Sequence, residues 1–325
     1  ICACLVGSEM CIRDRLKTFS KDYMSLVAVI IIFIVFSFAS PYFLKMSNVM
    51  NIFLQTATVA IVAIGQGMLI ITGQVDLSLG YQVCLTGCVF AYMMKFQNWN
   101  PVAAILLAVV IGCVAGAANG FLVAYWNIPA FIATLGLQYI CRGAAKIITN
   151  ATPIGNLPKS ISFLGNGYIG IVPVPILLML VLFIVFAFIM EKTRFGRNVY
   201  AIGGGREAAF YAGINTKAVQ FWVYVISGLL CAISGVVLTS RLNSAAITNG
   251  NLYEFDAYIG ASIGGISLTG GKGKLIGALF GSIFLTTFFN GMTMLNVDPF
   301  WQDVLKGVVL IAAIGLDAFR NRKTH

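Results

Sequence analysis

Long apolar runs separated by short polar intervals dominate the chain. Most runs reach about 20 residues, the length that a helix rising about 1.5 Å per residue needs to cross a hydrocarbon layer of about 30 Å. Tyr258–Thr269 is shorter, and a partial or re-entrant helix is the alternative to a full crossing there. The pattern therefore predicts an all-α polytopic membrane protein, a bundle of about ten transmembrane helices. The predicted segments are Ser25–Leu44, Ile52–Thr72, Leu77–Phe96, Val102–Tyr125, Ala130–Thr149, Ile171–Met190, Val219–Thr239, Tyr258–Thr269, Leu275–Leu295 and Phe300–Phe319.

The composition excludes an ordinary soluble domain. Of 325 residues, 59% are apolar and 10% are charged, and the mean hydropathy is +0.91. Soluble domains carry about 25% charged residues, and a chain this apolar cannot cover a surface that faces water. The formal charge of +10 does not indicate a nucleic-acid partner, because the basic residues lie mostly in the intervals between apolar runs.

The longest polar interval, Glu191–Ala218, lies between two strongly apolar runs and is rich in Lys and Arg. Short loops with this bias stay on the cytoplasmic side of a membrane. An even number of crossings then places both termini on the cytoplasmic side as well. In that orientation the inner segments hold most of the basic residues, which agrees with the rule.

The first 15 residues, Ile1–Arg15, stand apart from this pattern. They resemble the translation of a sequencing-adapter end, and we expect them to be a scar rather than part of the fold. Residues 16–325 are predicted to form a single transmembrane domain with a cytoplasmic loop at 191–218. Three of the eight cysteines lie in the first stretch; the other five lie in apolar runs, where we expect them to pack as small apolar side chains.

The residues needed for catalysis are missing from the pattern. The only histidine is His325, so a histidine-based triad or a zinc motif is not expected. The segment Gly264–Lys274 resembles a phosphate loop, but Ile266 stands where that motif needs glycine, and Gly273 stands where it needs Ser or Thr. We therefore expect no enzyme activity, no metal and no cofactor.

Three polar residues near the apolar runs are candidates for a pathway or gate. Asp76 and Ser78 lie between the second and third runs, and Asp256 precedes the eighth. A charge at the centre of a membrane helix costs at least about 2.5–3.5 kcal/mol, so such residues need a role. Asp76 either caps a helix N-terminus or lines a pathway.

Arg142 and Lys146 are one helical turn apart near the outer end of the fifth run. Their side chains either snorkel towards the membrane surface or contact an acidic surface of an extracytoplasmic partner. No ladder of buried carboxylates accompanies them, although ion-driven transporters usually display one. The pattern therefore disfavours a secondary transporter.

Small residues recur at the spacing of one helical turn in several runs. Such ridges let membrane helices approach closely, either within one bundle or between two subunits. The ridges are Gly112/Gly116/Gly120, Gly260/Gly264 and Gly277/Gly281.

A series of short motifs, in a fixed order and spacing from about Ser25 to Lys323, resembles the permease subunits of bacterial ATP-binding cassette (ABC) importers for monosaccharides. Each motif alone is weak, but the order of all of them is specific. The markers are Ile71-Thr72-Gly73, Asp76-Leu77-Ser78, Asn119-Gly120, Pro129–Gly136, Thr193–Arg197, Ala201–Gly204, Glu207-Ala208-Ala209, Gly213–Asn215, Tyr253–Ala257, Gly264-Gly265, Gly270-Gly271 and Asn296–Gln302.

The resemblance implies a permease of the bacterial cytoplasmic membrane that moves a sugar of the ribose, xylose or galactoside type. Two permease copies, surrounded by lipid, would form the pore, with ABC ATPase subunits below and a sugar-binding protein above. ATP hydrolysis would then belong to the separate ATPase subunits. The resemblance also implies a coupling helix that touches the ATPase, formed by Arg206, Glu207, Ala208, Ala209 and Gly213.

Two alternatives stay open at this point. The same machinery carries other small polar solutes in related systems, and an autoinducer furanose or a nucleoside is the first alternative. An ion-coupled secondary transporter, which works without an ATPase, is the second.

Overall fold

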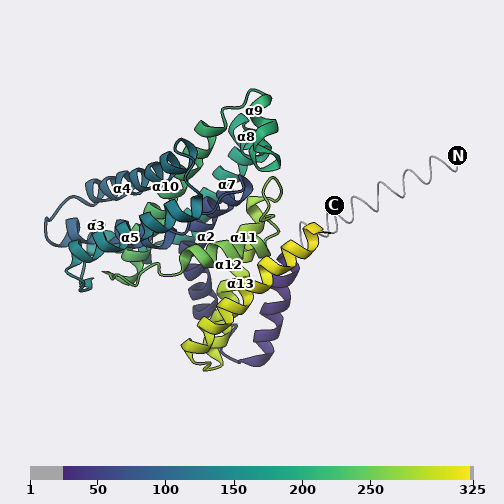
Figure 1. Ribbon diagram of the computed structural model, residues 1–325. Coiled ribbons are helices and arrows are strands. Elements are labelled where there is room, and N and C mark those ends of the chain that lie inside the picture. The colour runs from purple at the N-terminus through teal and green to yellow at the C-terminus, as the bar shows by residue number, and fades with distance from the viewer. Residues whose placement is uncertain (1–24, 323–325) are drawn as a thin grey trace.

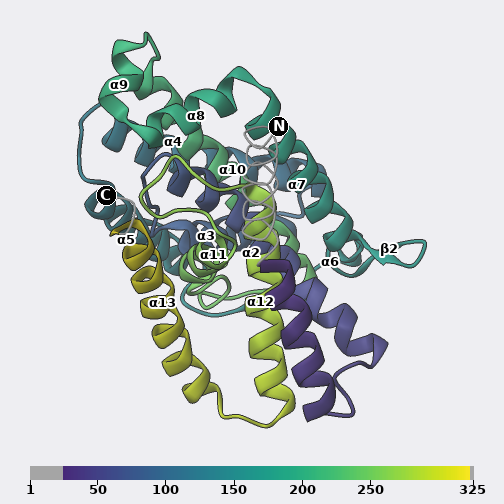
Figure 2. The same ribbon diagram turned by 90° about the vertical axis from the view of Figure 1, so that its right-hand side faces the viewer.

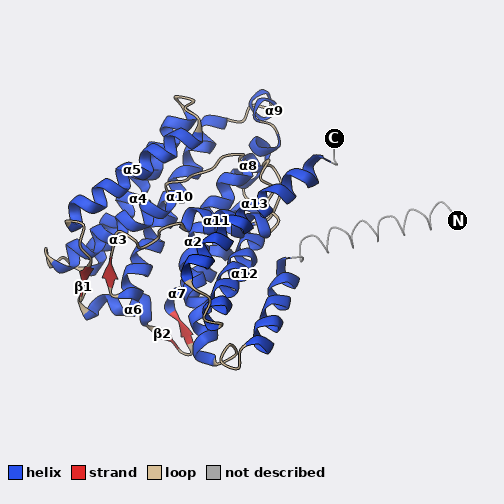
Figure 3. Ribbon diagram, turned by 60° about the horizontal axis from the view of Figure 1, so that its bottom comes forward, coloured by secondary structure: helices blue, strands red, loops and turns tan. Residues whose placement is uncertain are grey.

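The computed structural model describes residues 25–322, so the predicted scar at 1–15 and His325 lie outside the described residues. Helices make up most of this part, and two short antiparallel strand pairs, β1–β4 and β2–β3, are its only sheets (Figure 3). An unlabelled helix, Ser25–Ala39, comes first. The elements that follow are α2 (Met46–Ile71), α3 (Leu79–Lys95), α4 (Pro101–Ala124), α5 (Ala130–Thr149), β1 (Ile154–Gly155), η1 (Lys159–Ile161), α6 (Ser162–Asn166), β2 (Tyr168–Ile169), β3 (Val172–Pro173), α7 (Val174–Lys192), α8 (Arg194–Gly204), α9 (Arg206–Tyr211), α10 (Thr216–Leu242), β4 (Ser244–Ala245), α11 (Tyr253–Ile263), α12 (Leu275–Met294) and α13 (Pro299–Arg322).

The predicted all-α membrane architecture is confirmed. Six described helices, α2, α4, α5, α7, α10 and α12, are long and apolar enough to cross a membrane. The central helix is α2, which is buried without interruption from Thr56 to Ile71 and packs against α7, α10, α11 and α12 (Figure 1). In contrast, most residues of α4, α5 and α7 are only partly buried or exposed, as expected for helices that face lipid.

The eighth predicted segment needs a correction. The helix there is α11, which begins at Tyr253 rather than Tyr258 and ends at Ile263 rather than Thr269. Glu254 and Asp256 lie outside the predicted segment, but both are in the first turn of α11, where acidic side chains complement the positive end of the helix dipole.

The contacts of α11 with α2 show how far it reaches. The Tyr253 hydroxyl lies 3.3 Å from the Thr58 hydroxyl, near the middle of α2. Beyond the other end of α11, the Gly271 amide donates to the carbonyl of Ile71, the last residue of α2, at 2.8 Å. The 11 residues of α11 span about 16 Å. It is therefore a half-helix that extends from the middle of the bundle to one end.

The glycine ridges pack inside the bundle. On α4, a Cβ at Gly112 would lie 2.5 Å from the Gly228 carbonyl oxygen of α10, and a Cβ at Gly116 would overlap the Tyr224 carbonyl oxygen. The ridge of α11 meets that of α12, because a Cβ at Gly264 would overlap the Gly277 carbonyl group. Close backbone approach of this kind drives helix association where lipid removes the hydrophobic driving force.

The molecule has two distinct ends. Figure 2 shows α8 and α9 at one end, which we call the α9 end, and the turn between α12 and α13 at the opposite end. The 27 residues of α10 lead from α9 to β4, which pairs with β1 just after α5. The C-terminal end of α5 therefore lies at the opposite end of the bundle from α9.

Candidate functional site

The predicted basic loop folds into two short helices, α8 and α9. The Thr193 side chain caps α8 by accepting from the Gly196 amide at 3.3 Å, and Gly205 separates α8 from α9. Gly213 ends α9 with φ +83°, a left-handed conformation that glycine adopts without strain. The segment that the resemblance marks as a coupling helix is therefore a separate short helix, α9, that ends before Gly213.

The residues of α9 divide into an anchor and an exposed surface. Ala209 is buried in the main core cluster and fixes the helix to the bundle. Phe210 and Tyr211 are 64% and 85% exposed, and their rings contact each other at 5.8 Å between centroids. The exposed set, which we call the α9 surface, is Arg206, Glu207, Ala208, Phe210 and Tyr211. Two exposed aromatic rings beside charged side chains form a surface suited to a protein partner.

Asp76 and Ser78 belong to a buried polar network at the start of α3. The Asp76 carboxylate accepts from the Ser78 amide at 2.8 Å and from the Ser78 hydroxyl at 2.5 Å. Asn119 of α4 donates to Asp76 at 3.1 Å and to Ser78 at 2.9 Å, and Gln82 donates to Ser78 at 2.7 Å. Asp76, Ser78, Asn119 and Gln82 are fully buried. The N-cap residue of α3 is Ser78 rather than Asp76, so the Asp76 carboxylate orients the cap instead of forming it.

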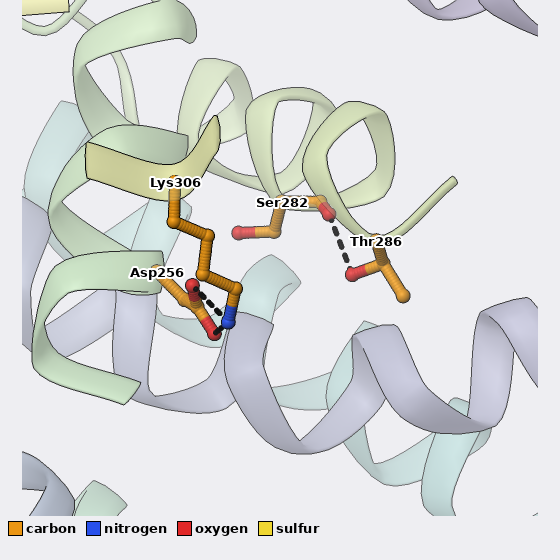
Figure 4. A network of polar contacts seen from close by, with 4 residues as sticks. All are labelled: Asp256, Ser282, Thr286 and Lys306. Atoms are coloured by element: carbon orange, nitrogen blue, oxygen red, sulfur yellow. Dashed lines mark hydrogen bonds and ion pairs between the residues drawn. The ribbon is translucent and has the colours of Figure 1, made fainter. Parts of the chain in front are cut away.

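Asp256 belongs to a second network, on α11. The Lys306 amino group of α13 lies 3.1 Å from both carboxylate oxygens of Asp256 (Figure 4). The same amino group lies 5.1 Å from the centre of the Phe289 ring of α12. Figure 4 also shows the neighbouring turn of α12, where the Thr286 hydroxyl donates to the Ser282 carbonyl at 2.9 Å. The ion pair therefore ties α13, which packs mainly on α11 and α12, to the half-helix.

Arg142 and Lys146 are exposed in the last two turns of α5, at the opposite end from α9. The Arg142 guanidinium stacks over the Tyr81 ring of α3, with 5.5 Å between its central carbon and the ring centre. This contact holds one of the two positive charges in a fixed position on that surface.

Three partners of these networks were not predicted as site residues. Asn119 carried a signal, because it lies in a quoted motif, and Lys306 carried one as a charge within an apolar run. Gln82 carried none beyond being a polar residue in an apolar run. Among the described residues, no group of three His, Cys, Asp or Glu side chains is placed to bind a metal. The candidate residues therefore form an exposed surface on α9, an exposed basic pair on α5 and a partly buried ion pair between α11 and α13.

Comparison with known proteins gives the same class of protein, a transport permease, as the motifs indicate. A family model described as a branched-chain amino acid transport system, permease component, matches residues 48–314. The chain belongs to this permease family. The match includes α3 to α12 in full and all but the first two residues of α2, so both polar networks and the α9 surface lie within it.

Several curated permeases resemble the chain over most of its length. The probable ABC transporter permease YphD of Escherichia coli K12 is 38% identical over 95% of this chain and 92% of its own. The ribose import permease RbsC of Bacillus subtilis 168 is 38% identical over 88% and 89%, and the xylose transport permease XylH of E. coli K12 is 31% identical over 93% of each. No solved structure matches the chain significantly. The predicted resemblance to monosaccharide importer permeases is confirmed.

Proposed function

We propose that this chain is the membrane-spanning permease of an ABC importer that moves a monosaccharide of the ribose, xylose or galactoside type across the bacterial cytoplasmic membrane. The observation that carries the proposal is the similarity to ribose and xylose permeases over nearly the full length of both chains. The permease supplies no chemistry of its own. ATP hydrolysis by separate ABC subunits drives its change of access from one side of the membrane to the other.

The α9 surface is the contact for those ATPase subunits. Its exposed aromatic rings can enter a groove of a partner, while buried Ala209 and the capped α8 hold α9 rigidly against the bundle. A rigid helix of this kind transmits a push without bending. The α9 end is then cytoplasmic, as the basic residues of 191–218 predict.

The opposite end receives the sugar-binding protein. Arg142 and Lys146 present two positive charges there and would meet an acidic surface of that protein. The proposed orientation thus places ATPase and binding protein on opposite faces of the membrane, as an importer requires.

The side of the bundle formed by α11 and α13 faces a second permease copy. Lys306 keeps 26% of its side chain exposed and Asp303 of α13 is exposed. Such charges are costly against lipid, which favours a protein or water-lined neighbour on this side. Asp256, through its pair with Lys306, is therefore the candidate that we place at the pathway, whereas Asp76 and Ser78 hold the start of α3.

Reversal of one charge on the α9 surface tests the proposal. Glu207→Arg should weaken ATPase binding by about 30-fold or more. Loss of one partner of an interfacial charge pair costs at least about 2 kcal/mol of binding free energy, which corresponds to this factor. Glu191→Arg, an equal change at the exposed end of α7, is the matched control. Co-purification of the ATPase from membranes measures the binding, and the amount of permease in the membrane measures insertion.

Substrate and energy source are tested on the same complex. The permease, its ATPase and its binding protein are reconstituted in vesicles, and a panel of ribose, xylose, galactose, a nucleoside and a furanose is tested for stimulation of ATP turnover. Stimulation by a sugar supports the proposal. Uptake that follows an ion gradient without any ATPase, or unchanged ATPase binding by Glu207→Arg, contradicts it.

A further inference from the structure

The segment Gly264–Lys274, which resembles a phosphate loop in sequence, has another role in the fold. It joins the half-helix α11 to α12 at the α9 end, and we call it the glycine loop. Its residues Gly270, Gly271 and Gly273 have φ of +88°, +71° and +115°. Residues with a Cβ rarely adopt these values, so the glycines fix the path of this loop.

The glycine loop contacts α8 backbone to backbone. A Cβ at Gly203 of α8 would overlap the carbonyl oxygen of Ile71 and the amide nitrogen of Gly271. A Cβ at Gly271 would lie 2.7 Å from the Gly204 amide nitrogen. The Gly271 amide also donates to the Ile71 carbonyl at 2.8 Å. The end of α2, the middle of the glycine loop and the end of α8 therefore meet without intervening side chains.

A side-chain hydrogen bond reinforces this contact. The Tyr200 hydroxyl, one turn before Gly203 on α8, donates to the Gly273 carbonyl at 2.7 Å. Burial, with a smaller contribution from the Glu191 carboxylate, raises the pKa of Tyr200 to about 12. The phenol therefore stays protonated and remains a donor at any physiological pH.

On its other side the glycine loop is continuous with α11. The Ile266 amide donates to the Ala261 carbonyl at 3.0 Å, and the Ser267 amide donates to the Lys272 carbonyl at 3.1 Å. These bonds close the loop on itself and on the last turn of α11. The glycine loop is thus fixed to α11, the helix that carries Asp256 and its ion pair with Lys306.

We infer that Tyr200 and Gly203, held against the glycine loop, form the joint through which a movement of α9 and α8 displaces the half-helix α11. The inference rests on the proposed contact of the α9 surface with an ATPase. A backbone contact suits this role because no flexible side chain absorbs the movement. Beside the joint, an open cleft of about 480 Å³ between α7, α8 and the glycine loop leaves room for α8 to shift.

A matched pair of glycine substitutions tests the joint. Gly203→Ala inserts a methyl group between α8, α2 and the loop, whereas Gly204→Ala meets no atom within 4 Å. Each variant is reconstituted with its ATPase and binding protein, and uptake and ATP hydrolysis are measured together. We expect Gly203→Ala to keep the ATPase bound but to raise the ATP used per solute imported by about fivefold or more, the lower range of typical coupling energies. Gly204→Ala should behave as the unaltered protein.

Tyr200→Phe keeps the test decisive if Gly203→Ala does not fold. It removes a single hydrogen bond worth about 1 kcal/mol, which corresponds to about a fivefold loss of coupling. If both variants use the normal amount of ATP per solute imported, the inference that Tyr200 and Gly203 form a joint is refuted. Loss of ATPase binding in Tyr200→Phe also overturns it, because the residue would then serve docking. Absence of ATPase binding by the unaltered permease would instead refute the proposed function.

Discussion

The ion pair between Asp256 and Lys306 allows a quantitative test of how α13 is held. Lys306→Met leaves the Asp256 carboxylate, 8% exposed, without its cation. Removing one partner of a fully buried pair costs about 3–5 kcal/mol. Because 26% of the Lys306 side chain is exposed and water screens part of the interaction, we expect a loss of about 2–3 kcal/mol in the free energy of unfolding.

The reverse and double substitutions isolate the pair. Asp256→Leu leaves a lysine that can reach solvent and should cost about 1 kcal/mol. Replacing both partners by apolar residues is often neutral or stabilising, so Asp256→Leu with Lys306→Met should lose no more than about 1 kcal/mol. The difference between this value and the sum of the single losses gives a coupling energy of about 2–3 kcal/mol.

Unfolding of the purified permease in mixed micelles, followed by tryptophan fluorescence, measures these free energies. Lys146→Met, which removes an exposed lysine of α5, is the control and should change the stability by no more than about 0.5 kcal/mol. If the losses of the single variants add to that of the double variant within about 0.5 kcal/mol, the pair contributes no coupling and the reasoning is refuted.

Two further predictions concern packing and the opposite end of the molecule. Gly228→Ala should destabilise the bundle by about 1–3 kcal/mol, because its methyl group would overlap the Gly112 carbonyl oxygen. The control is Gly143→Ala, whose methyl group meets no atom within 4 Å and should leave the stability unchanged. Melting temperatures in detergent compare the two variants. Reversing both charges of Arg142 and Lys146 to Glu should weaken the binding protein's affinity for the permease in vesicles, most strongly at low salt, because the attraction becomes a repulsion that salt screens. An unaltered affinity at low salt would exclude this surface as the contact.

The sequence predicted most of the helices because a membrane span must be apolar and about 20 residues long. The bounds of α5, Ala130–Thr149, agree with the prediction, and α12 differs by one residue. The α11 half-helix was misplaced because acidic residues at its start look like a loop when only hydropathy is considered. Their environment inside the bundle, next to the N-terminus of a helix, is a tertiary property.

The candidate residues could also be predicted only in part from the sequence. The resemblance that the motifs carry predicted an ATPase contact at Arg206, Glu207, Ala208, Ala209 and Gly213, and that contact stays a prediction. The pairing of Asp256 with Lys306 joins residues 50 positions apart, and the Asp76 network needs Asn119 from another helix. A charged side chain in an apolar run can be recognised from the sequence, but the residues that it contacts in the fold cannot.

By itself, the sequence determined that this chain is a helical membrane protein and to which family its motifs belong, whereas the side that its basic loop faces stays a prediction. These properties follow from hydropathy, charge and the order of short motifs, which are local along the chain. Only the tertiary structure decided that α11 is a half-helix, that the glycine ridges pack within one bundle, and that the glycine loop contacts α8. Those outcomes depend on which backbones approach each other, and close approach between distant segments leaves no periodic signal in the sequence.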